Sequence, residues 1–180
     1  MLETARRSGR TAAQLALSTA LGLTLSGCAP EGLAFRVDER LRFVTPEDRA
    51  TVSLPLTIDW DIRDFEVISP GGEPTKDAGY FAAFVDTTPM PPGESLRWVG
   101  RKDNACENTP QECLTAEYLS IRGVYPTSET KLVLKQLPLT GAEERRERHR
   151  VTIVLLDASG SRIGESAFEL AFDIERKDLS

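Results

Sequence analysis

The chain has 180 residues, with 28 acidic and 22 basic side chains, one histidine, and a formal net charge of −6 at pH 7. An acidic balance argues against a nucleic-acid partner, because binding to phosphates requires a basic surface. With one histidine and three cysteines in the chain, a blue-copper site, which needs two histidines, a cysteine and usually a methionine, is excluded.

Residues 1–27 have the features of an export signal. Arg6, Arg7 and Arg10 form a positive region, and residues 11–25 behind them carry no charge. A positive region followed by an apolar stretch and small residues is the pattern of a secretory signal peptide. A membrane-spanning helix needs about 20 predominantly apolar residues, and this stretch is diluted by Thr, Ser, Gly and Gln. The sequence therefore predicts a signal peptide over residues 1–27.

The stretch ends in Leu25, Ser26, Gly27 and Cys28. These four residues resemble the lipobox of bacterial lipoproteins, in which a leucine three positions before the cysteine is followed by two small residues. The resemblance implies cleavage between Gly27 and Cys28, a diacylglycerol on the Cys28 thiol, and acylation of the new amine. One alternative is a coincidental cysteine after an ordinary signal peptide or in a core helix. A twin-arginine signal is the other, but the residues after the arginine pair fit that pattern poorly.

An acylated Cys28 would anchor the protein to a membrane, because two or more acyl chains give stable attachment. Ala29 follows Cys28, in place of the aspartate that resembles an inner-membrane retention signal, so the outer membrane is favoured if the envelope is Gram-negative. Residues 1–27 carry three arginines and one glutamate, so the remaining 153 residues have a net charge of −8. That length fits one domain, and its charge argues against an electrostatic grip on anionic lipid.

Cys106 and Cys113 are the two cysteines that remain if Cys28 is lipidated. In an oxidising exported compartment such a pair predicts a disulfide. Closing a loop of this length stabilises a fold by about 2–3 kcal/mol in the chain-entropy model. The alternative, a metal site with two cysteine ligands, lacks further ligands because His149 is the only histidine.

After a short tether over residues 28–38, we expect one β domain over residues 39–180. The strongest strand pattern covers residues 52–62, where six apolar positions alternate with polar ones. Pro55 places part of this strand at an edge or a bulge. Residues 79–86 and 151–156 are apolar on both faces, and residues 168–174 alternate. Shorter strands are expected at 41–45, 95–99 and 131–137, with a short element of unassigned type at 118–121.

Short strands separated by turn residues predict an all-β fold, a single antiparallel β-sandwich of about seven strands. The pattern resembles the immunoglobulin-like or fibronectin type III-like modules of exported bacterial proteins, although no cysteine pair flanks a tryptophan. Trp60 and Phe172 lie on alternating apolar faces and are expected to share one core.

Few residues are candidates for chemistry. His149 lies in a run of mixed charge, residues 143–150, which predicts a solvated loop and no catalytic role, since nucleophilic catalysis needs a positioned base. Met90, among prolines, is expected to be a packed turn residue.

The strongest candidate for a ligand cluster is acidic: Asp59, Asp61, Asp64 and Glu66. Carboxylates gathered at the end of a strand could hold Ca²⁺. In the alternative interpretation, Asp59 and Asp61 are only the solvent face of the strand, and Arg63 neutralises the group without a metal.

From these observations we expect no cofactor and a non-enzymatic envelope module, bound to membrane lipid through Cys28 and interacting with a protein or glycan partner or serving in assembly. The alternative is an envelope enzyme that uses acidic residues or a bound metal ion. Such an enzyme requires a concave pocket with convergent polar groups.

Overall fold

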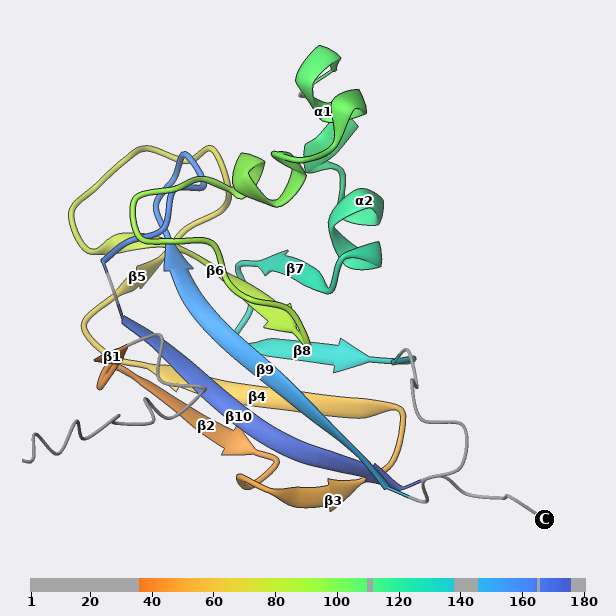
Figure 1. Cartoon of the computed structure of the whole chain (residues 1–180). Coiled ribbons are helices and arrows are strands. Elements are labelled where there is room, and N and C mark those ends of the chain that lie inside the picture. Colours follow the sequence, from red (N-terminus) through yellow and green to blue (C-terminus); the bar gives the residue numbers. More distant parts are fainter. Residues whose placement is uncertain (1–35, 110–111, 138–145, 165, 176–180) are drawn as a thin grey trace, which may run out of the picture. The chain divides into compact units, whose positions relative to one another are not determined.

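Two β-sheets packed face to face form the core of the domain (Figure 1). The structure is a computed structural model, and it describes residues 36–109, 112–137, 146–164 and 166–175, all of which belong to the compact unit Leu33–Ser180. The predicted signal peptide and most of the predicted tether lie outside the described residues. In these described ranges, no helix combines the length and the apolar character needed to cross a membrane.

The described strands are β1 (Arg36–Val37), β2 (Leu41–Thr45), β3 (Ala50–Val52), β4 (Leu56–Ile62), β5 (Glu66–Val67), β6 (Ala78–Val85), β7 (Val124–Thr127), β8 (Lys131–Leu134), β9 (Arg146–Leu156) and β10 (Ser166–Glu175). Between β6 and β7 lie the 3-10 helix η1 (Leu96–Gly100), α1 (Asn104–Asn108), the 3-10 helix η2 (Glu112–Leu114) and α2 (Ala116–Ile121).

The larger sheet has the order β1-β10-β9-β6-β5, with β3 also paired to β10 and β7 to β6; the smaller sheet has the order β2-β4-β8. The prediction of a mostly β, sandwich-like fold is therefore confirmed. The sheets are not wholly antiparallel, because β1 and β3 pair in parallel with β10, and β5 with β6. The described residues form ten strands and not about seven. These three parallel strands have only two or three residues, too few for a period of two to show in the sequence.

The predicted strand over residues 52–62 divides at Pro55. Residues 50–52 form β3 in the larger sheet, and residues 56–62 form β4 at the centre of the smaller one. Proline has no backbone N–H to contribute to a ladder, so it fits the link between two sheets better than a strand interior. Alternation persists in β4, whose inward positions are buried: Leu56, Ile58 and Trp60.

Apolar side chains from both sheets meet in one core, which we call the inter-sheet core. Trp60 of β4 is 1% exposed and packs edge-on against Phe81 of β6, with ring centroids 5.5 Å apart. Phe172 of β10 is fully buried in the same core, as predicted. At the rim, Phe43 of β2 stacks on Phe168 of β10 at 5.0 Å.

Strand β6 is buried on both faces, as its continuous apolar sequence predicted. Its second face belongs to another core, in which Tyr80, Ala82 and Phe84 pack against Met90, Leu96 and Leu119. We call residues 88–123, which carry the helices, the helical layer. Met90 is fully buried, as expected for a packed turn residue. The smaller sheet and the helical layer thus cover opposite faces of the larger sheet.

One short element differs from its prediction, and a second, whose type the sequence left open, is a helix. Residues 95–99, predicted as a strand, form η1, because the periodicity of so short an apolar run cannot separate strand from helix. The element expected at 118–121 is the end of α2, which begins after Thr115, whose Oγ1 accepts the backbone N–H of Tyr118.

The end of the predicted tether belongs to the fold. Arg36 and Val37 pair with β10, and the N–H of Asp38 donates to the carbonyl of Ala167 at 2.9 Å. The domain therefore includes residues 36–38, which the sequence had placed in the tether.

We expect Trp60→Ala to lower the free energy of unfolding by about 3–5 kcal/mol, the usual loss when a buried aromatic ring is removed. The matched control is Thr57→Ala, an exposed position on the same strand, where the change should stay within about 0.5 kcal/mol. Urea unfolding of both purified variants measures the difference. Equal losses would contradict the assignment of Trp60 to the core.

Candidate functional site

The predicted disulfide lies in the helical layer. Cys106 of α1 and Cys113 of η2 are bonded, with their Cα atoms 5.4 Å apart, inside the range of about 4.4–6.8 Å usual for disulfides. The bond joins α1 to η2 directly. By contrast, Gly27 and Cys28, the predicted cleavage and lipidation site, lie outside the described residues.

A hydrogen-bond network centred on Asp103 connects α1 to α2. Asp103 Oδ1 caps α1 by accepting the backbone N–H of Ala105. Asp103 Oδ2 accepts hydrogen bonds from the Tyr118 hydroxyl at 3.0 Å and from Arg122 Nη2 at 2.9 Å. The Arg122 guanidinium also lies over the Tyr118 ring, 3.5 Å from its centroid. Partial desolvation and the hydrogen bond to Asp103 raise the pKa of the Tyr118 phenol. The same hydroxyl lies 2.9 Å from Cys106 Sγ, so the network and the disulfide adjoin.

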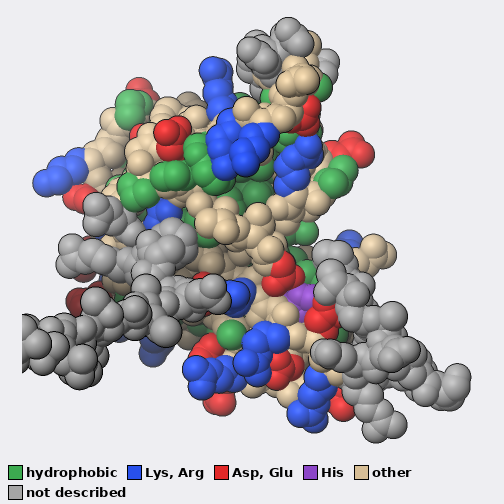
Figure 2. All heavy atoms as spheres, viewed as in Figure 1, with side chains coloured by type: hydrophobic (Ala, Val, Ile, Leu, Met, Phe, Trp, Pro, Cys, Tyr) green, Lys and Arg blue, Asp and Glu red, His purple; other side chains and the backbone are tan. Residues whose placement is uncertain are grey.

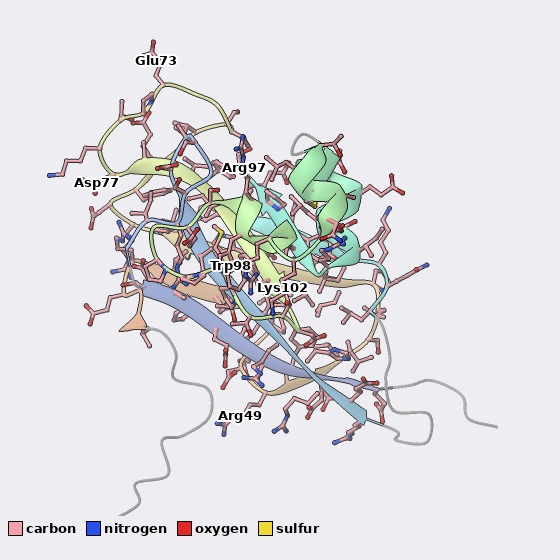
Figure 3. The ribbon with its side chains drawn as sticks, turned by 45° about the horizontal axis from the view of Figure 1, so that its top comes forward. Arg49, Glu73, Asp77, Arg97, Trp98 and Lys102 are labelled. Carbon is pink, nitrogen blue, oxygen red and sulfur yellow. A yellow bond between two sulfur atoms is a disulfide. The ribbon has the colours of Figure 1, made fainter. Side chains whose placement is uncertain are left out.

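Three exposed cations project from η1 and the turn after it: Arg97, Arg101 and Lys102. We call them the basic cluster. Figure 2 shows Lys and Arg side chains gathered beside hydrophobic ones in the upper half of the view, and Figure 3 labels Arg97, Trp98 and Lys102 on this segment. Among the described residues, no ion pair joins any of the three cations to a carboxylate.

Arg101 is held in place by its neighbour Trp98. Its guanidinium carbon lies 3.1 Å from the centroid of the Trp98 ring, and its Nη1 donates to the Trp98 carbonyl at 2.8 Å. Trp98 itself is partly buried against the second core, so it is a fixed support. Sequence analysis missed this cluster, although three cations within six residues without an acidic one were visible in residues 97–102.

The prediction that His149 lies in a solvated loop was wrong: the side chain is buried in a strand. It lies in β9, 2% exposed, with its ring stacked on Phe172 at 5.8 Å between centroids. Residues 146–150 of the charged run belong to β9, because Arg146, Arg148 and Arg150 take the outward alternate positions of the strand. Arg148 pairs there with Asp173 of β10 at 3.0 Å. His149 takes an inward position of the same alternation.

His149 also has a positioned partner. Its Nδ1 lies 2.6 Å from Oδ2 of Asp86, a residue that follows β6 with a left-handed φ of 52°. Oδ1 of Asp86 accepts the N–H of Arg150, and the N–H of Asp86 donates to the Arg150 carbonyl. His149 Nε2 is enclosed and has no hydrogen-bond partner in the part of the chain that the structure describes. The His149–Asp86 contact and the two hydrogen bonds between Asp86 and the backbone of Arg150 thus join the end of β6 to β9.

The four acidic residues of the calcium hypothesis are distributed over two sheets. Asp59 and Asp61 lie on β4, where Asp61 pairs with Arg42 of β2 at 3.0 Å and Asp59 is opposite Lys131 of β8. Asp64 lies in the link after β4, and Glu66 in β5 of the larger sheet. Within the described ranges, no group of three or more His, Cys, Asp or Glu side chains could hold a metal ion.

Comparison with known proteins adds no family to these observations. No family model, no curated protein and no solved structure matches the chain.

We expect His149→Ala to lower the free energy of unfolding by about 2–4 kcal/mol, because it leaves a cavity in the core and removes the hydrogen bond to Asp86. The control is Arg148→Ala, next to it on β9, whose exposed ion pair should contribute less than about 1 kcal/mol. Both values come from urea unfolding at neutral pH. If the two losses are the same, the buried position of His149 is wrong and the solvated loop predicted from the sequence is restored.

Proposed function

We propose that this chain is a bacterial envelope lipoprotein, anchored to a membrane through acylated Cys28, whose domain is a non-enzymatic binding or accessory module. The observation that carries the proposal is the sequence Leu25-Ser26-Gly27-Cys28 after a charge-free apolar stretch and a positive region. In the lipoproteins that it resembles, such a sequence directs export, cleavage and lipidation. Ala29 favours the outer membrane if the envelope is Gram-negative.

The disulfide supports the exported location. Structural disulfides form and persist in oxidising compartments and are rare in the cytosol of most organisms. The bond between Cys106 and Cys113 is therefore what an exported chain would contain. It lies in a layer of short helices that gains from an added covalent link.

The distance from the anchor to the domain supports a module that works at the membrane. Eight chain steps separate Cys28 from Arg36, the first residue of β1. Fully extended, they span at most about 26–29 Å. A lipid on Cys28 would thus keep the domain next to the membrane surface, within reach of other components of the envelope.

The chemistry of the described side chains supports a binding role over the alternative of an envelope enzyme. His149, the one imidazole, is enclosed and joined to Asp86, and Asp61 is paired with Arg42. The likeness to immunoglobulin-like modules remains part of the proposal. It is supported by two sheets that pack around the inter-sheet core, whereas the parallel pairing of β1, β3 and β5 differs from a wholly antiparallel sandwich.

Expression of the whole chain in a bacterial host that processes lipoproteins tests the proposal. Mass spectrometry should show loss of residues 1–27 and acyl mass on Cys28, and the protein should stay in the membrane fraction after a high-salt wash. Cys28→Ala should lose this attachment, because the thiol that receives the lipid is gone. The double variant Cys106→Ser/Cys113→Ser is the control and should keep it. Firm membrane attachment of Cys28→Ala, or an unprocessed N-terminus, would refute the lipoprotein assignment.

A further inference from the structure

We propose that the basic cluster, together with Trp98, is the face through which the domain docks on the phospholipid surface of its own membrane, with headgroup phosphates as ligands of Arg97, Arg101 and Lys102. The inference rests on the proposed function, since it requires the acyl anchor on Cys28 to hold the domain at that surface. It goes further by assigning an orientation and a set of contacts to the anchored domain.

The first argument is the arrangement of Arg101. A guanidinium presents several N–H donors in one plane and binds phosphate oxygens in a bidentate manner. The Arg101 guanidinium stacks on the Trp98 ring and donates a hydrogen bond from Nη1 to the Trp98 carbonyl. These two contacts fix the plane of the guanidinium before any ligand binds. A side chain that is already ordered loses less conformational entropy on binding. Arg101 is therefore prepared for an oxyanion.

The second argument is the composition of the surface. Arg97 and Lys102 are exposed on either side of this pair, and within the described residues neither forms an ion pair with a carboxylate. Tryptophan with arginine and lysine is the combination typical of segments at the membrane interface, where the rings and stems are apolar and the charged ends meet headgroups. Figure 2 shows Lys and Arg side chains beside hydrophobic ones in the upper half of the view, and Figure 3 labels Arg97, Trp98 and Lys102.

Residues 88–123 include five acidic residues and four basic ones, so the contact is assigned to the basic cluster itself and not to the net charge of the helical layer or of the chain. At physiological salt the Debye length is about 8 Å, so charges on the far side of the domain are largely screened from a surface touching the helical layer. The outer face of the smaller sheet, with Asp59 and Asp61, lies across both sheets from this layer. The lipid anchor holds the domain close to the membrane. The basic cluster therefore has only to favour one orientation of the domain on that surface.

The main competing ligand is an acidic segment of a protein partner. The membrane is favoured because the eight steps between Cys28 and Arg36 keep the start of the domain, Arg36, within about 26–29 Å of the anchored residue. A phosphate-rich surface is then always next to the domain, whereas a partner would have to be recruited.

The test uses the acylated protein, purified from membranes and reconstituted into vesicles containing phosphatidylglycerol with bromine-labelled acyl chains near the headgroup. Flotation first shows whether the protein is anchored. Tryptophan quenching by the brominated lipid then reports docking. The chain contains two tryptophans, and Trp60 is buried in the inter-sheet core, so the quenched emission should come from Trp98. Trp98→Phe should abolish the quenching while flotation continues.

The charge-reversed variant Arg97→Glu/Lys102→Glu should float and unfold at the same urea midpoint as the wild type but lose the quenching of Trp98. The matched control is Lys131→Glu/Lys135→Glu, which reverses two exposed charges on and just after β8 of the smaller sheet and should quench like the wild type. If the protein floats and Trp98 is not quenched, or if both double variants quench equally, docking is overturned and the lipoprotein function stands. A protein that does not float overturns the anchoring itself, and the docking proposal with it.

Discussion

The structure depends on one constraint: β6 and the second half of β9 are apolar on both faces, so both faces of the larger sheet must be covered. The smaller sheet covers one face through the inter-sheet core around Trp60, Phe81 and Phe172. The helical layer covers the other through Met90, Leu96 and Leu119. The close approach of the two central strands also excludes a side chain at Gly79, whose Cβ would collide with the Leu156 carbonyl.

The smaller sheet and the helical layer differ in the interactions that stabilise them. The smaller sheet has its own ladders, whereas the described helices have only three to six residues each and would not persist alone. The helical layer relies on its contacts with β6, on the Asp103 network and on the disulfide between Cys106 and Cys113. These supports also fix η1, which presents the proposed docking residues.

Long periodic segments were predictable from the sequence, because burial on one or both faces leaves a pattern in the residues themselves. This applies to β4, β6, the apolar half of β9, and β10, and the cysteine pair followed from chemistry. Features set by distant partners were not. The burial of His149 depends on Asp86, 63 residues away, and on Phe172 across the ladder. The short parallel strands and η1 are too brief to show a period, and the basic cluster forms only because η1 is a helix that brings Arg101 over Trp98.

Amide hydrogen exchange of the oxidised and the gently reduced protein, followed by mass spectrometry, tests this account most directly. The central claim is that the two-sided burial of β6 and β9 is the stable centre, and that the helical layer is a separate cover that the disulfide secures. The account predicts the slowest exchange in residues 78–85 and 151–156 in both states, with reduction accelerating exchange in residues 96–121 while β4 stays protected. Unchanged protection of residues 96–121 after reduction, or simultaneous loss of protection in β4 and β6, would contradict it.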